Sequence, residues 1–180
     1  SVIGEDRETT IIDGGGDGSV VLFINGENGE LKQFTLTNGY MDNSEGALPY
    51  GGGIRIVNSS PNISDCKIIN NEVFGNSAYG GGVYIHGENA SPNITNCLIA
   101  DNLAQVWAGG IFVESSGSTT IDSCSIYNNS VTQNGAGAIH AHDVTLLTIA
   151  NSIISHNTVY GSGGGINASG NSMLNIYNSE

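Results

Sequence analysis

The stretch GGVYIHGENASPNITNCLIADN, residues 81–102, decides the fold because the chain repeats it. The next copy, GGIFVESSGSTTIDSCSIYNN at residues 109–129, keeps the Gly-Gly-aliphatic start, the Cys and the closing Asn. The small-small-aliphatic start recurs along the chain with its aliphatic residues spaced 29, 28, 28 and 27 positions apart, at Ile54, Val83, Ile111, Ile139 and Ile166. A fixed period of this length indicates a repeat architecture.

Further columns keep the same register. They are an aliphatic column (Ile63, Ile94, Ile121, Ile149, Ile176), a thiol or hydroxyl column (Cys66, Cys97, Cys124, Ser152, Ser179), a second aliphatic column (Ile68, Ile99, Ile126, Ile154) and an amide column (Asn71, Asn102, Asn129, Asn157). A degenerate copy lies upstream, where Leu22, Leu31, Phe34 and Leu36 align with Ile54, Ile63, Cys66 and Ile68. We therefore expect residues 1–13 to belong to one more coil.

Each copy contains short stretches in which apolar and polar residues alternate, such as Ile54-Arg55-Ile56. These stretches are too brief for helices and are interrupted by Gly, Asn, Ser and Pro, which predicts strands. One unit cannot bury its own apolar side, so the copies must stack, with each strand ~4.8 Å from its counterpart. We expect one all-β domain over residues 1–180, of about six coils with roughly 28 residues each.

The repeats resemble those of the right-handed parallel β-helix in the pectate-lyase-like superfamily. The Gly-Gly-Ile strand, the Asn-Ile-Thr-Asn-Cys-Leu-Ile stretch at residues 93–99 and the closing Asn carry the resemblance, which covers nearly the whole chain. Similar repeats occur in secreted bacterial proteins and in chlamydial polymorphic outer-membrane proteins. The resemblance implies the fold, but it selects no activity, because this scaffold serves lyases, hydrolases, adhesins and spacers.

The composition excludes several classes of protein. The 27 Gly, 22 Asn and 20 Ser residues favour turns and argue against a helical bundle. Only 4 Lys and Arg oppose 17 Asp and Glu, so the net charge is −13 and nucleic acid is a poor partner. No apolar run reaches the roughly 18 residues of a membrane-spanning helix. We expect no membrane insertion and an extracellular or cell-surface location of the bacterial type.

Two columns are expected to be structural. Cys66, Cys97 and Cys124 fall among inward positions, and they lack the paired Cys-x-x-Cys spacing of a metal site, so we interpret them as a buried stack of free thiols. The Asn column is expected to turn the chain between two strands. Asn tolerates left-handed backbone, and its amide can bond to the next Asn in the stack.

Aromatic residues gather along one expected edge of the solenoid. Residues between the inward positions of the first strand should face outward, giving the column Phe23, Arg55, Tyr84, Phe112, His140 and Asn167. Stacked rings are a platform for sugar rings, so we predict carbohydrate binding by Tyr50, Tyr79, Trp107, Tyr84 and Phe112. In the alternative interpretation, rings on neighbouring coils only stabilise one another.

Two residues beyond this column, His86, Glu114 and His142 form a row on three successive coils. These residue types are typical of a divalent-metal site and of general acid–base catalysis on a polysaccharide. In the alternative interpretation, the row is a solvated ladder in which one carboxylate pairs with two imidazoles. An enzyme would draw its catalytic residues from Arg55, His86, Glu114, His140 and His142. Arg55 is the only permanent cation on this edge, and no cluster of Asp lies there, so we rank an enzyme second.

The loop Asp13-Gly14-Gly15-Gly16-Asp17-Gly18 is superficially similar to a calcium loop, which makes Asp13 and Asp17 candidate metal ligands. Calcium-binding β-rolls need tandem copies with aligned ligands, and this chain has a single copy. We therefore expect no cofactor and interpret this loop as a plain turn. Ca²⁺ binding at the loop is the alternative.

These observations favour an extracellular structural or adhesive β-helix module that contacts a polysaccharide or a cell-surface glycan. The first alternative is a polysaccharide lyase or glycoside hydrolase of the superfamily that the repeats resemble. The second is a self-assembling fibre subunit. No amphipathic helix or polar repeat covers either end, so we expect a segment of a longer solenoid or, alternatively, end-to-end self-association.

Overall fold

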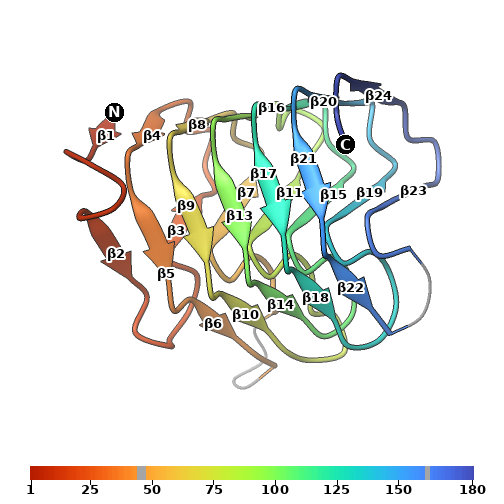
Figure 1. Ribbon diagram of the computed structural model, residues 1–180, viewed down its shortest axis with the longest axis horizontal. Helices are drawn as coiled ribbons and strands as arrows, with labels where there is room; N and C mark the ends of the chain where they lie inside the picture. The colour runs from red at the N-terminus through yellow and green to blue at the C-terminus, as the bar shows by residue number, and fades with distance from the viewer. Residues whose placement is uncertain (44–47, 161–162) are drawn as a thin grey trace.

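The computed structural model describes residues 1–43, 48–160 and 163–180 as a stack of coils, with the two termini at opposite ends of the long axis (Figure 1). These residues form four parallel sheets, to each of which a complete coil contributes one strand. The described ranges contain no helix, and hence none long and apolar enough to cross a membrane. The predicted all-β solenoid of about six coils, with about 28 residues per coil, is confirmed.

The four sheets run along the length of the solenoid. Sheet 1 contains β1 (Val2–Ile3), β4 (Glu30–Lys32), β8 (Asn62–Ser64), β12 (Asn93–Thr95), β16 (Ser118–Asp122), β20 (Leu146–Ala150) and β24 (Leu174–Tyr177). Sheet 2 contains β2 (Ile11–Asp13), β5 (Thr35–Thr37), β9 (Lys67–Ile69), β13 (Leu98–Ala100), β17 (Ser125–Tyr127) and β21 (Ile153–Ser155). Sheet 3 contains β6 (Tyr40–Met41), β10 (Glu72–Val73), β14 (Leu103–Ala104), β18 (Ser130–Val131) and β22 (Thr158–Val159). Sheet 4 contains β3 (Val21–Phe23), β7 (Ile54–Val57), β11 (Val83–His86), β15 (Ile111–Glu114), β19 (Ile139–His142) and β23 (Ile166–Ser169).

Equivalent residues of successive coils pair in register. Val83 of β11 pairs with Ile54 of β7 on one side and with Ile111 of β15 on the other. The inward side chains consequently pile up as one core, whose largest fully buried members are Leu36, Ile54, Ile56, Ile63, Ile68, Ile85, Ile94, Ile99, Ile111, Ile121, Ile126 and Ile139. Full burial of each such side chain contributes roughly 1.5–3 kcal/mol, so the aliphatic columns supply most of the driving force for folding.

The three cysteines lie side by side in this core. Cys66, Cys97 and Cys124 are free and buried, as predicted. The backbone N–H of Leu98 donates to the Cys66 carbonyl at 2.9 Å, and that of Ser125 donates to the Cys97 carbonyl at 2.9 Å, which fixes the three coils against one another. Contacts with the Cys124 and Cys66 thiols, followed by burial, raise the pKa of Cys97 well above its usual value.

The amide column forms the predicted hydrogen-bonded ladder. The Nδ2 group of Asn71 donates to Oδ1 of Asn102, Asn102 donates in the same way to Asn129, and Asn129 to Asn157, each at 3.0 Å. The predicted left-handed backbone is wrong by one residue. It lies at the preceding positions, Asn70, Asp101, Asn128 and His156, whose φ angles are 55°, 56°, 54° and 56°. The residue at the corner turns the chain, and the residue after it can then point its amide inward.

The Gly-Gly signal of the repeat follows from close packing of the backbone. A Cβ atom on Gly81 would lie 2.5 Å from the carbonyl oxygen of Leu103 and 2.7 Å from that of Gly109. A Cβ atom on Gly82 would lie 2.8 Å from the carbonyl oxygen of Gly110. Adjacent coils therefore leave no room for a side chain at the entrance to β11.

The first strand of sheet 4 departs from the prediction by one residue. Leu22 pairs with Arg55, and Phe23 pairs with Ile56, whereas the sequence aligned Leu22 with Ile54 and placed Phe23 in the outward column. Leu22 is accordingly exposed, and Phe23 packs against the core. Since side chains alternate between faces, a slip of one residue exchanges inward and outward positions.

Candidate functional site

Sheet 4 carries a column of rings on the side that faces away from the core. Tyr84 of β11, Phe112 of β15 and His140 of β19 occupy paired positions on neighbouring strands. The ring centroids of Tyr84 and Phe112 are 5.9 Å apart with planes inclined by 5°, and those of Phe112 and His140 are 5.2 Å apart with planes inclined by 7°. The predicted stack on successive coils is therefore present.

A second column of rings covers the first. Parallel bridges join Tyr50 to Tyr79 and Tyr79 to Trp107, so these residues also repeat from coil to coil. Their rings contact the first column at centroid distances of 4.5 Å for Tyr50 on Tyr84, 4.9 Å for Tyr79 on Phe112 and 4.6 Å for Trp107 on His140. We call the two columns together the aromatic face: Tyr50, Tyr79, Tyr84, Trp107, Phe112 and His140.

This cover corrects the expected exposure of the first column. Tyr84 and Phe112 are each 3% exposed and His140 is 4% exposed, because the second column shields them from solvent. The sequence placed all three at an open edge. Tyr50, Tyr79 and Trp107 are half-buried and present the rings that remain accessible.

His86, Glu114 and His142 occupy paired positions on successive strands, but their side chains do not interact as one group of three. His86 Nδ1 lies 3.6 Å from Oε2 of Glu114, and the Tyr84 hydroxyl donates to the same oxygen at 3.1 Å. His142 instead contacts Ser169 Oγ at 2.9 Å through Nδ1. In the parts of the chain that the structure covers, no group of three or more His, Cys, Asp or Glu is placed to hold a metal ion, so a metal on this row gains no support.

A pocket opens where the aromatic face meets this row. Its volume is about 240 Å³, and its lining consists of Tyr79, Trp107, Phe112, Glu114, His140, His142 and Ser169. Three aromatic rings therefore border the same space as four groups that form hydrogen bonds. The sequence did not single out Ser169, although it pairs with His142 and extends the His-Glu-His row by one coil.

Burial keeps the imidazole of His140 neutral. Burial, and then the charge of His142, lowers the pKa of His140 to about 4. His140 Nε2 lies 3.3 Å from Ser169 Oγ, while Nδ1 has no hydrogen-bond partner among the described residues. Burial followed by the Glu114 carboxylate also raises the pKa of Tyr84 well above its usual range, so that its hydroxyl stays a donor.

Arg55 lies outside this pocket. Its guanidinium carbon is 5.7 Å from the centroid of the Tyr50 ring, at the other end of the aromatic face. The pocket lining contains His140 and His142 of the proposed catalytic set, together with Glu114, but neither Arg55 nor His86. The five candidate catalytic residues thus share a sheet without converging on one space.

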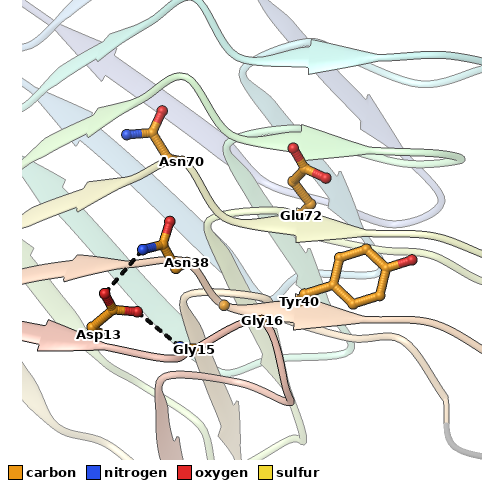
Figure 2. Close-up of a pocket in the computed structure, with 8 residues that line it drawn as sticks. Asp13, Gly15, Gly16, Asn38, Tyr40, Asn70 and Glu72 are labelled. Carbon is orange, nitrogen blue, oxygen red and sulfur yellow. Dashed lines mark hydrogen bonds between the residues drawn. The ribbon is translucent and has the colours of Figure 1, made fainter.

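A larger hollow of about 650 Å³ lies beside the predicted calcium loop (Figure 2). Asp13 accepts hydrogen bonds from the Gly15 N–H at 2.8 Å and from Asn38 Nδ2 at 3.1 Å, and these bonds, in that order, lower the pKa of Asp13. Figure 2 shows this cluster apart from Glu72, the other carboxylate of the lining. Asp17 does not line the hollow, so calcium binding by Asp13 and Asp17 stays a prediction without a converging set of ligands.

Comparison with known proteins supports the architecture. A family model described as right handed beta helix region matches residues 81–180, which is more than half of the chain. No curated protein and no solved structure matches the chain.

Proposed function

The chain belongs to the family of right-handed β-helix regions. We propose that it is a structural or adhesive module that binds carbohydrate at the aromatic face. The observation that carries the proposal is the pocket in which Tyr79, Trp107 and Phe112 meet Glu114 and His142. The family match indicates the repeat fold, and the binding function is inferred from the side chains that this fold brings together.

The lining suits a sugar because a pyranose ring has both apolar and polar surfaces. Aromatic rings offer flat apolar area on which the C–H groups of a sugar can pack. The oxygen and nitrogen atoms of Glu114, His142 and Ser169 can bond to hydroxyl groups at the rim of the same ring. A few placed polar groups among aromatic side chains are typical of sites for small ligands.

The scaffold also holds this pocket in a preformed state. Tyr79 and Trp107 are fixed by bridges between coils, and Phe112 and His140 lie on central strands of sheet 4. Rings held in this way lose little conformational freedom when a ligand arrives, which favours affinity. A repeating scaffold that presents rigid rings is well suited to adhesion.

The composition supports an extracellular partner and location. The chain has 17 acidic and only 4 basic residues, and its net charge of −13 disfavours nucleic acid as a partner. We propose a bacterial extracellular or cell-surface setting, with a polysaccharide or a cell-surface glycan as the partner.

Polysaccharide cleavage is the second candidate function, and one contact favours it. His142 Nε2 lies 3.4 Å from Asp143 Oδ2, and His142 shares the pocket with Glu114. An imidazole oriented by one carboxylate beside another carboxylate is a set that acid–base chemistry can use. Glycoside hydrolysis ordinarily needs two carboxylates that flank the bond, and in the described residues Glu114 is the only carboxylate of the lining. Binding without cleavage is therefore the better supported function.

The proposal is tested by screening the purified chain against neutral and acidic polysaccharides, with and without Ca²⁺, for both binding and products. Trp107→Ala should weaken binding at least tenfold, because a buried aromatic anchor typically contributes about 2 kcal/mol or more. Tyr160→Ala is the matched control, because Tyr160 is exposed and lies outside the pocket. A melting curve for each variant separates lost binding from lost folding.

Each outcome of this screen favours a different candidate function. Binding that needs Trp107 and leaves the glycan intact supports the module. Unsaturated products that absorb ultraviolet light, or newly formed reducing ends, support the enzyme. If no glycan binds and concentrated protein grows filaments in electron micrographs, the fibre subunit replaces both.

A further inference from the structure

The permanently charged side chains at the aromatic pocket are acidic. Glu114 is part of the lining, and Asp143 lies directly behind His142. No Lys or Arg belongs to the lining in the described part of the chain. A ligand in this pocket therefore meets negative charge without a compensating guanidinium or ammonium group.

The basic side chains are engaged elsewhere. Arg7, Lys32 and Lys67 bond to groups outside the aromatic face. Arg55 lies against the Tyr50 ring, 5.7 Å from its centroid, and is absent from the pocket lining. None of the four basic side chains therefore lines the pocket.

The remaining polar groups of the pocket both donate and accept hydrogen bonds. Neutral His140 has one donor and one acceptor nitrogen, and its Nδ1 is buried without a partner among the described residues. Ser169 Oγ lies 3.3 Å from His140 Nε2 and 2.9 Å from His142 Nδ1, and its hydroxyl can act in either sense. Sugar hydroxyls also donate and accept, whereas a carboxylate can only accept.

The size of the pocket limits what enters it. Pockets for drug-sized ligands span roughly 300–1,000 Å³. A pocket of about 240 Å³ is smaller and suits one ring of a longer chain.

We infer that the pocket takes one uncharged pyranose residue of a glycan and rejects a uronic-acid residue. The inference rests on the proposed function and adds the class of sugar to it. A uronate would bring a second negative charge beside Glu114, with no Lys or Arg of the lining to offset it in the described residues, and like charges so placed strongly disfavour a complex. A neutral ring would instead meet groups matched to its hydroxyls and rings matched to its C–H face.

The test compares short oligosaccharides that differ only in oxidation at carbon 6. Suitable pairs are α-1,4-linked galacto-oligosaccharides with oligogalacturonates and β-1,4-linked manno-oligosaccharides with oligomannuronates, titrated by calorimetry at pH 7. Each titration is run at 0.15 M salt and at 1 M salt, where the Debye length is about 3 Å, so that the net charge of −13 does not decide the result. We expect at least one neutral oligomer to bind about tenfold or more tightly than its uronate.

Two variants locate the source of the preference. Glu114→Gln removes the charge and keeps an oxygen that can accept from Tyr84, so it should bring the uronate close to the neutral oligomer in affinity. Asp101→Asn makes the same charge change at an exposed corner that suits Asn, and it should leave the preference unchanged.

Each outcome has one meaning. If both members of every pair bind equally, if the uronate binds better, or if Asp101→Asn shifts the preference as much as Glu114→Gln, the inference is overturned and carbohydrate binding stands. If no oligosaccharide of either kind binds, the proposed function itself fails.

Discussion

The ring of Trp107 lies against His140, with centroids 4.6 Å apart and planes inclined by 57°. This contact closes the aromatic face over an imidazole that is 4% exposed. Protonation of His140 would place a charge beneath an indole, far from bulk water, and the stability of the face is therefore linked to pH.

We predict that the folded chain loses stability as the pH falls from about 6.5 toward 4. Burial, and then the charge of His142, lowers the pKa of His140 to about 4, whereas an unfolded His titrates near 6.5. Between these values the unfolded chain binds more protons, so the free energy of unfolding decreases with falling pH, by at most about 3 kcal/mol. Urea unfolding at a series of pH values measures this slope.

His140→Phe should flatten the dependence of unfolding free energy on pH between about 6.5 and 4. The new ring can remain stacked on Phe112, but it has no titrating group. His156→Asn is the control, because His156 is exposed and its left-handed backbone accepts Asn. Equal slopes for the native chain and His140→Phe would show that His140 does not carry the effect.

Asn102→Ala should destabilise the solenoid by about 3 kcal/mol or more. Asn102 Nδ2 donates to the Ile68 carbonyl and to Asn129 Oδ1, and Asn102 Oδ1 accepts from the backbone and side chain of Asn71. Removal of this amide leaves several buried groups unpaired, each at a cost of about 1–3 kcal/mol. Chemical unfolding provides the measurement, and Asn134→Ala at an exposed site should change stability by less than about 0.5 kcal/mol.

Gly81→Ala should destabilise the chain, by about 1–3 kcal/mol, although it adds a single methyl group. The new carbon would lie 2.5 Å from the Leu103 carbonyl oxygen, in the backbone of β14. Gly165→Ala is the matched change, because nothing lies within 4 Å of the position that its new methyl group would take, and it should be neutral or slightly stabilising. Thermal melting of both variants tests the contrast, and similar melting temperatures would refute it.

The architecture was predictable because each inward column repeats at a near-constant spacing. When coils stack in register, Cys66, Cys97 and Cys124 become neighbours, and any column read from the sequence becomes a row of contacts. The first strand of sheet 4 was misaligned since Val21, Leu22 and Phe23 are all apolar, so alternation cannot distinguish its two faces.

The candidate site was only partly predictable. The sequence identified the members of the aromatic face, but the burial of Tyr84 depends on Tyr50 leaning across from the preceding coil, which no spacing encodes. The pairing of His142 with Ser169 instead of Glu114 likewise depends on side-chain rotation. Extension of the row by one coil would have found Ser169, because that position follows the same period.

The most direct test of carbohydrate binding at this pocket uses Trp107, the single tryptophan of the chain, as its own reporter. Titration with neutral oligosaccharides should produce a saturable change in tryptophan emission and should protect the indole from quenching by acrylamide. An oligosaccharide that binds by calorimetry but leaves the emission and quenching of Trp107 unchanged would place the binding site elsewhere and contradict the central claim.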